Sequence, residues 1–334
     1  MRKKLEESLM SKEKTDAIGY DRYACGVFIV RADNANFNAD FSHMPRELPD
    51  GQIYATDKAL KYCIRKYIHD IEGKDKVFAW RRFEINKKGK LEPLELEGNI
   101  AYLSKKPVKD VSQKEMVELA LSKEDVRLFG VTLAVGDKNI SITGPCQITY
   151  GVNVFKPGSA YTSAILSPYS SEKGNEKSTI GSESRATEVH YVYDFNINPN
   201  NLTQDEQIKT LFEKENANKY YLNSQDIQLF KEAITRGVNY VTSTTKVGAV
   251  GELLLFVEFE KGAERQVPLV PLLKTKITVS ENASKRKIDL AEAIKSLKDY
   301  SPKEVSVYYD PEYTEVEGLN PDIKCFHIGT HNKV

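Results

Sequence analysis

Residues 24–31 read ACGVFIVR and residues 56–68 read TDKALKYCIRKYI, and these two stretches decide the beginning of the fold. The first is a short apolar run, typical of a buried strand. The second places Leu60, Ile64 and Ile68 at helical spacing, which predicts an amphipathic helix with one buried stripe. The Asn-rich stretch between them has the composition of an irregular loop. A strand, a loop and a helix are therefore expected in this order.

The middle of the chain predicts further strands. FGVTLAV at 129–135, the turn GDKN and ISITGPCQITYGVNVF at 140–155 are typical of a hairpin. Apolar and polar residues alternate along its second half, so we expect one apolar and one polar face. The apolar set is Ile148, Tyr150, Val152 and Val154, and the polar set is Gln147, Thr149, Gly151 and Asn153.

Two more strands and a helix follow. HYVYDFNI at 190–197 alternates like a strand, and GELLLFVEF at 251–259 is long enough and apolar enough for a buried one. Without its insertions the chain has the order strand, helix, two strands, helix, strand, which is the βαββαβ pattern of ferredoxin-like and RRM folds. We therefore predict an α+β fold built on a modified RRM-like palm. The helix between these strands buries Ile227, Phe230, Ile234 and Val238.

The composition excludes few classes of function. The 48 basic and 48 acidic residues cancel, so a nucleic-acid site requires local clusters of cations. The four cysteines are widely spaced, which indicates reduced thiols in a cytoplasmic protein. The first 20 residues lack the apolar core of a signal peptide, and the best apolar run is much shorter than a membrane span. We expect a soluble protein.

Patterns of catalytic and cofactor sites are missing from the sequence. The five histidines form no HExxH or HxH pattern, and GxSxG, GxGxxG and the P-loop motif do not occur. We therefore predict no metal, no cofactor and no catalytic residue. RRM domains stack bases on a motif of basic residues and interleaved aromatic residues, and this motif is also missing. If the chain binds RNA, we expect it to hold the RNA backbone in a groove.

Three groups of polar residues suit phosphate or base contacts, and each has a plain alternative. The cations of the helix at 56–70 lie opposite its apolar stripe, yet a solvated basic face explains them too. The asparagines of loop 33–40 offer amide donors, yet Asn also favours loops for local reasons. The stretch VTSTTK at 241–246 offers hydroxyls and a lysine, which turn chemistry explains as well.

Five segments resemble the backbone subunit of type I CRISPR Cascade complexes, the Cas seven family of the RAMP superfamily, and its type I-B branch in particular. They keep the order of that family and span roughly residues 20–260. The segments are NANFNADFSHMPRELPDGQIYATDKALKYCIRKYI at 34–68, DVRLFGV at 125–131, ITGPCQITYGVNVF at 142–155, STIGSESRATEVHYVYDFNIN at 178–198 and LFKEAITRGVNYVTSTTKVGAVGELLLFVEF at 229–259.

The resemblance implies a hand-shaped, non-catalytic subunit. Head-to-tail copies would bind one guide crRNA, present it to a target DNA strand and join other Cascade subunits, with no membrane involved. The implied organisation is a charged extension at 1–20 and one body at 21–334, with fingers at about 75–123, a protruding, mobile thumb at about 156–189 and a C-terminal elaboration at about 261–334.

The resemblance, together with the polar groups above, predicts a set of RNA-binding residues. Thr244 and Thr245 depart from the family, because a basic residue often stands at this turn. The predicted contacts are Asn34, Asn36, Asn38, Arg46, Lys58, Lys61, Arg65, Gln147, Arg185, Ser243, Thr245 and Lys246.

Two other classes of function stay open at this point. Type III relatives cut target RNA with a loop aspartate, for which Asp33 or Asp40 would be the candidate here. A structural assembly protein that never touches nucleic acid is the second alternative. Cleavage of complementary RNA would favour the first, and purification without copurifying RNA would favour the second.

Overall fold

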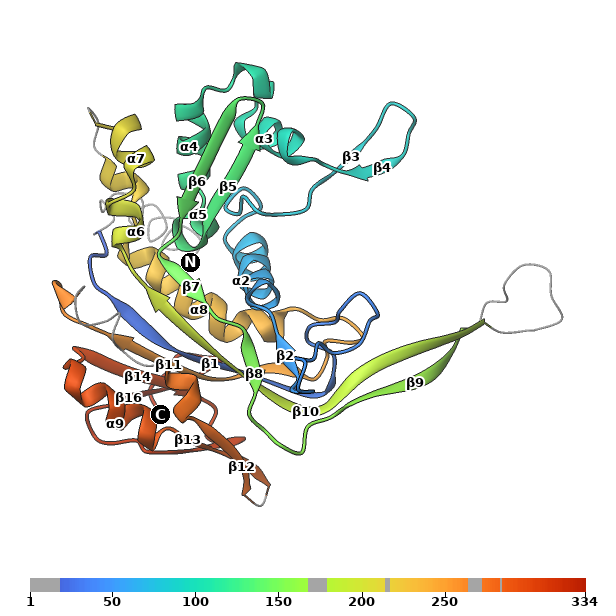
Figure 1. Cartoon of the computed structure of the whole chain (residues 1–334), viewed down its shortest axis with the longest axis vertical. Helices are drawn as coiled ribbons and strands as arrows, with labels where there is room; N and C mark the ends of the chain where they lie inside the picture. The colour runs from blue at the N-terminus through green and yellow to red at the C-terminus, as the bar shows by residue number, and fades with distance from the viewer. Residues whose placement is uncertain (1–18, 168–178, 214–216, 264–271, 283) are drawn as a thin grey trace, which may run out of the picture. The chain divides into compact units, whose positions relative to one another are not determined.

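Strand β1 (Ala24–Ala35) is the central strand of a large sheet, and it pairs antiparallel with β10 on one side and β11 on the other (Figure 1). The strands follow in the order β16-β14-β11-β1-β10-β8-β2, and β7 and β9 also pair with β10. Their bounds are β2 Tyr54–Ala55, β7 Cys146–Ile148, β8 Gly151–Asn153, β9 Ala160–Ser167, β10 Thr179–Ile197, β11 Ala249–Glu258, β14 Glu304–Tyr309 and β16 Lys324–His327.

The computed structural model describes residues 19–167, 179–213, 217–263, 272–282 and 284–334. The chain forms two units, and the large sheet belongs to the unit made of residues 22–72, 146–197 and 232–334. Parts of the predicted N-terminal extension, thumb and C-terminal elaboration lie outside the described residues. The mixed content of strands and helices confirms the predicted α+β class.

Helix α2 (Asp57–Ile71) begins where the sequence predicts a helix. The Thr56 hydroxyl accepts the amide of Ala59 at 3.3 Å and caps the first turn. Leu60, Ile64 and Ile68 are fully buried, which confirms the predicted stripe. The stripe positions the helix against the fold and leaves its polar side for other contacts.

Helix α8 (Ser224–Tyr240) continues from one unit into the other, and its second half lies beside α2. A Cβ at Gly237 would lie 2.8 Å from the carbonyl oxygen of Cys63, so only glycine allows this close approach. The Asn239 side chain accepts the amide of Gly251 at 2.9 Å and ties the helix to β11. The predicted stripe Ile227, Phe230, Ile234 and Val238 is buried, as expected.

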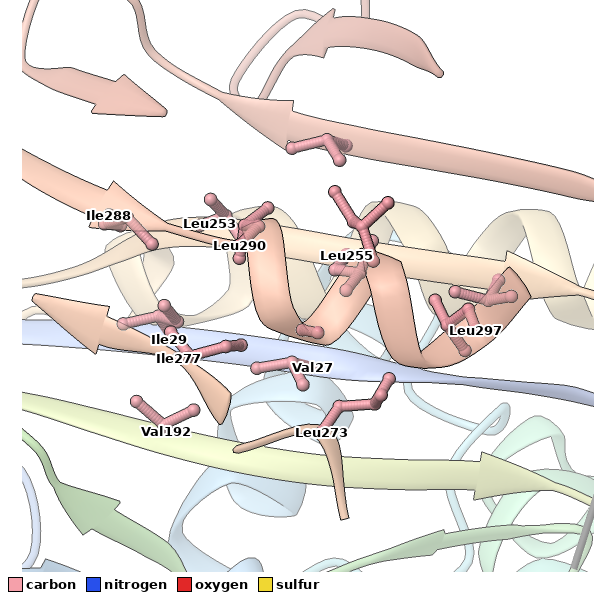
Figure 2. Close-up of a cluster of buried hydrophobic side chains, with 14 of the residues drawn as sticks. Val27, Ile29, Val192, Leu253, Leu255, Leu273, Ile277, Ile288, Leu290 and Leu297 are labelled. Atoms are coloured by element: carbon pink, nitrogen blue, oxygen red, sulfur yellow. The ribbon is translucent and has the colours of Figure 1, made fainter. Parts of the chain in front are cut away.

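The C-terminal part of the chain covers the sheet with a second layer (Figure 2). Val27, Ile29 and Leu255 of the sheet pack with Ile288 and Leu290 of this layer. Each buried aliphatic side chain contributes roughly 1.5–3 kcal/mol, and truncating one to Ala costs about 2–5 kcal/mol. The layer consists of β12 (Thr278–Asn282), β13 (Lys285–Asp289), β15 (Thr314–Glu317) and α9 (Ala291–Leu297), while β14 and β16 extend the large sheet.

The other unit, made of residues 19–21, 73–145 and 198–231, has its own core. The hairpin predicted from FGVTLAV and ISIT is present, but it forms a separate two-stranded sheet. The unit contains β3 (Phe83–Ile85), β4 (Leu91–Pro93), α3 (Leu96–Ser104), α4 (Gln113–Leu121), α5 (Glu124–Phe129), β5 (Gly130–Val135), β6 (Lys138–Thr143), α6 (Asn200–Thr203) and α7 (Glu206–Leu211).

Two local predictions were wrong. The alternation predicted for residues 147–154 holds only to Ile148, because the strand breaks there and β8 begins at Gly151. Tyr150 is therefore exposed, and Asn153 is buried with its side chain bonded to the backbone of Phe155. The first strand also runs four residues past Arg31, so the first asparagine belongs to strand β1.

Residues 156–189 contain a long hairpin. Strand β9 pairs antiparallel with the first half of β10, from Ala160 opposite Ala186 to Ser167 opposite Thr179. The second half of β10 continues into the large sheet. In Figure 1 the β9–β10 hairpin projects from the sheet of its unit.

Candidate nucleic-acid interface

The segment after β1 is held in place by a buried asparagine. Asn36 is 4% exposed, and its Nδ2 donates to the carbonyls of His43 at 3.0 Å and Ser184 at 3.1 Å. Asn34 has a φ of 47°, in the left-handed region that Asn tolerates better than most residues. The amide contacts therefore fasten loop 36–46 to the base of the β9–β10 hairpin.

The turn at residues 242–248 lies against the same segment. The backbone amide of Asp33 donates to the carbonyl of Gly248 at 3.0 Å, and the backbone amide of Asn36 donates to the carbonyl of Thr245 at 2.7 Å. Within the turn, the carbonyl of Ser243 accepts the amides of Lys246 and Val247. The predicted asparagines and the predicted hydroxyl-lysine stretch are therefore neighbours in space.

Arg185 joins these two segments to the β9–β10 hairpin. Its guanidinium donates to the carbonyl of Asn34 at 2.6 Å and to the carbonyl of Thr244 at 2.9 Å. A third contact at 2.9 Å reaches the carboxylate of Glu183. One side chain thus bridges three separate stretches of chain, and the loop and turn are ordered around a cation.

Lys246 is directed toward the interior. Its ammonium donates to the carbonyl of Phe37 and lies 5.0 Å from the centre of the Phe37 ring. Burial lowers the pKa of Lys246, and Cys63 acts in the opposite direction. We conclude that this lysine supports the loop from beneath.

Asn38 fixes the position of helix α2 relative to the loop. Its Oδ1 accepts the backbone amide of Thr56 at 2.9 Å and the Thr56 hydroxyl at 3.0 Å. The same threonine caps the helix, so loop and cap form one hydrogen-bonded unit. Lys58 is exposed in the first turn that follows.

The other predicted cations of α2 are more involved in the fold. Lys61 pairs with Asp57 at 3.2 Å, four residues earlier in the helix, and its side chain is 12% exposed. Arg65 is partly buried. Lys58 is therefore the predicted helix cation with the greatest access to solvent.

Gln147 lies apart from the loop. It pairs with Asn196 of β10, whereas the loop end of β1 pairs at Ala186. Ten residues of strand separate these positions, or about 33 Å at the usual rise. Lys61 acts electrostatically on Cys146, the residue before Gln147: burial raises the pKa of that thiol to about 12, and Lys61 opposes the increase.

Some buried polar side-chain atoms of the loop and of strand β1 have no hydrogen-bond partner. Among the described residues they include Nε of Arg31, Oδ1 of Asn36 and Nε of Arg46. Folded proteins rarely leave such atoms unpaired, so each one marks unused bonding capacity. Arg46 is otherwise held through its carbonyl, which accepts the amide of Tyr54 at 2.9 Å.

Sequence reasoning missed two contributors to this region. The hydroxyl of Tyr161 donates to the Asn34 side chain at 3.2 Å, and the hydroxyl of Thr162 contacts the Met44 sulfur at 3.2 Å. Both come from β9, inside the segment that had been predicted only as an insertion. The sequence AYTSAILS does not alternate between apolar and polar residues, so no periodic signal marked these two side chains.

The two aspartates of the nuclease alternative have local roles. The carboxylate of Asp40 accepts the amides of Ser42 at 2.8 Å and Met44 at 2.9 Å, which closes a turn. Asp33 accepts the Asn34 side-chain amide at 2.8 Å and is exposed. Among the described residues, no cluster of three or more His, Cys, Asp or Glu side chains is arranged to hold a metal ion. In the described part of the chain, no helix has the length and apolar character to cross a bilayer.

Comparison with known proteins identifies the family. The sequence model of the CRISPR-associated protein Cas7 matches residues 22–305, which is most of the chain. The chain therefore belongs to the Cas7 family. No curated protein matches the sequence.

Solved structures show weaker likenesses. A chain of a CRISPR RNA-guided surveillance complex in a pre-nicking state is 12% identical, with a TM-score of 0.44 over 90% of this chain and 97% of that one. A second CRISPR RNA-guided surveillance complex gives 12% identity and a TM-score of 0.42 over 90% and 95%. A type III-B Cmr-beta complex bound to cognate target RNA gives 10% identity and 0.29 over 62% and 53%. These scores are too low to define a shared fold, so the family assignment depends on the sequence match.

Proposed function

We propose that the chain is a guide-RNA-binding backbone subunit of a type I CRISPR effector complex, closest to the I-B branch. Copies would assemble head-to-tail along one crRNA and present it for pairing with target DNA. The observation that carries the proposal is the convergence of loop 33–46, turn 242–248, the start of α2 and the base of the β9–β10 hairpin. Membership of the Cas7 family supports it independently.

The order of the strands supports an RRM-like palm. Strands β11, β1, β10 and β8 are neighbours, α2 follows β1, and α8 precedes β11. This is the arrangement of a βαββαβ unit. We place the fingers at about 75–123, the thumb at about 156–189 and the C-terminal elaboration at about 261–334.

The layers that cover the sheet favour an RNA groove at the end of strand β1 over RNA binding on the sheet face. RRM domains stack bases on an open sheet face. Here the C-terminal layer buries the face that carries Val27, Ile29 and Leu255, and α2 and α8 pack on the palm as well. A single RNA strand would therefore follow the polar loops where β1 ends, close to Arg185 and Lys58.

The balance of charge suits a subunit that packs against copies of itself. Head-to-tail contacts use two different surfaces, so basic and acidic patches can complement each other. The projecting β9–β10 hairpin is our candidate for the contact with the neighbouring copy. Cations near the groove would then hold the RNA phosphates without a large net charge.

We also infer that the subunit is non-catalytic. Oδ1 of Asp40 accepts two backbone amides, so this side chain already has a structural role in closing the turn, whereas a catalytic base must be directed at the group whose proton it accepts. Incubating the assembled complex with complementary RNA and a divalent metal checks this. We expect intact RNA, and cleavage at regular intervals would contradict the inference.

The groove is tested by the salt dependence of RNA binding. We compare wild type with Lys58→Ala/Lys61→Ala, and use Lys295→Ala/Lys298→Ala, in α9 and directly after it, as the matched control. The slope of log affinity against log salt is negative, and each lost phosphate contact makes it less steep by about 0.7 for a single strand. We therefore expect the slope to become less steep by up to about 1.4 for the first variant only, with circular dichroism unchanged. Equal slopes in both variants would contradict the proposed groove.

A further inference from the structure

Phe41 is the most exposed large apolar side chain of the described residues. It is 99% exposed, whereas the next, Ile85, is 73% exposed. Phenylalanine is usually at least partly buried, because water is a poor solvent for its ring. A ring with no covering atoms in the free chain is therefore available to a ligand.

The backbone that carries Phe41 is well ordered. The Asp40 carboxylate accepts the amides of Ser42 and Met44, and the Asp40 amide donates to the Met44 carbonyl at 2.8 Å. Ala39 and Pro45 form an antiparallel bridge below the turn. The ring is thus presented at the tip of a closed turn, and little conformational entropy is lost when it binds.

The tip lies beside the proposed RNA groove. The carbonyl of His43 accepts from Asn36, and the same Asn36 side chain contacts Ser184. Phe41 is two residues from His43, so their Cα atoms are at most about 7.6 Å apart. The Oδ1 of Asn36, buried and without a partner among the described residues, adds an unused acceptor at this point.

The surroundings favour a nucleobase over a protein partner. Protein interfaces centre on apolar patches sealed by neighbouring contacts. Around Phe41 the residues Ser42 and His43 are polar and exposed. A lone ring in polar surroundings matches the π face of a base, because the sugar and phosphate attached to the base need polar neighbours.

We propose that Phe41 is a stacking platform for one unpaired base of the guide strand. The inference rests on the proposed function and adds a base contact to a groove otherwise made of phosphate contacts. Stacking is tolerant of base identity, so the contact does not select a sequence.

The test measures the affinity of the purified chain for single-stranded polyuridine RNA. Phe41→Ala removes the ring, Phe41→Trp keeps a stacking surface, and Tyr313→Ala is the matched control, because Tyr313 is 61% exposed in the C-terminal layer. Base–aromatic stacking predicts that Phe41→Ala binds about 5- to 150-fold more weakly. Phe41→Trp and Tyr313→Ala should bind as wild type does.

Fluorescence gives a second readout. The chain has one tryptophan, Trp80, so the emission added by Phe41→Trp can be separated from that of wild type. Stacking on a base should quench the added emission when RNA is present. Unquenched emission with normal RNA affinity would overturn the inference.

The outcomes separate this inference from the proposed function. Normal affinity of Phe41→Ala, with reduced affinity of Lys58→Ala/Lys61→Ala, would overturn the stacking contact and leave the groove intact. A loss of self-association without RNA, at unchanged affinity, would assign Phe41 to a neighbouring copy and also overturn it. Absence of RNA binding by wild type would overturn both.

Discussion

Replacing His190 by leucine should loosen the C-terminal layer. His190 is fully buried, and its ring nitrogens lie 2.5 Å from Oε2 of Glu252 and 3.0 Å from Oε1 of Glu188. Glu188 in turn receives two bonds of 2.7 Å from Arg286 of β13. These four side chains link strands β10 and β11 to the layer that covers them.

The magnitude follows from burial. Removing His190 leaves Glu252, which is 5% exposed, without its partner. Breaking a buried pair on one side costs about 3–5 kcal/mol. The exposed pair Lys324–Glu304 is the control, and Lys324→Ala should cost at most about 1 kcal/mol.

The effect should depend on pH. Burial lowers the pKa of His190, but the bonds to Glu188 and Glu252 outweigh it, and the net pKa is raised above 6.5. A raised folded pKa means that this stabilisation is complete below pH 6.5 and is lost as pH rises through the folded value. The difference between wild type and His190→Leu should therefore shrink in alkaline solution.

Hydrogen exchange is the appropriate assay, because a chain with two units need not unfold in one step. Peptides from β10, β11 and β13 should exchange about 100-fold faster, or more, in His190→Leu at pH 6. Peptides of the other unit should not change. Exchange equal to that of Lys324→Ala would show that the buried pair does not stabilise this layer.

Three further predictions concern single residues. Arg127→Met should cost about 3–5 kcal/mol of local stability and speed hydrogen exchange in α5 and α8 accordingly, because Arg127 contacts Asp226 at 3.0 and 2.7 Å in a buried pair. Unchanged hydrogen exchange would contradict this. Gly130→Ala should lower thermal stability by more than about 1 kcal/mol, since its φ is 76° and a Cβ would lie 2.2 Å from the Ile142 carbonyl; an unchanged melting temperature would count against it. Burial raises the pKa of Asp194 to about 6, and bonds from Lys274 oppose the shift. Because the pKa of this carboxyl is higher in the folded than in the unfolded chain, the stability of the folded chain falls as pH rises from 3.8 to about 6. Asp194→Asn should therefore resist urea better than wild type at pH 7 and equally well at pH 4.

The local elements were predictable from the sequence, because their signals are periodic and short in range. The stripe of α2 repeats every four residues, and its burial follows from that spacing alone. Tyr150 shows where such reasoning stops. A strand break between Ile148 and Gly151 reverses the phase of the alternation, and nothing in the apolar pattern marks the break.

The candidate site was predictable by residue type and less so by geometry. The sequence points to Asn36, Arg185 and Lys246 as polar residues in separate segments. Their convergence depends on carbonyls of Asn34, Thr244 and Phe37, and every residue has a carbonyl, so sequence carries no trace of these contacts. The packing of β13 and α9 on the sheet also depends on contacts between residues that are far apart in the sequence.

Loop 33–46, turn 242–248 and the base of the β9–β10 hairpin should together line one channel for the guide. Photocrosslinking of the assembled complex with 4-thiouridine guide RNA, followed by mass spectrometry, tests this arrangement. We expect crosslinks to peptides containing Phe41, Arg185 and residues 242–248. Crosslinks confined to the sheet of β12, β13 and β15 would contradict it.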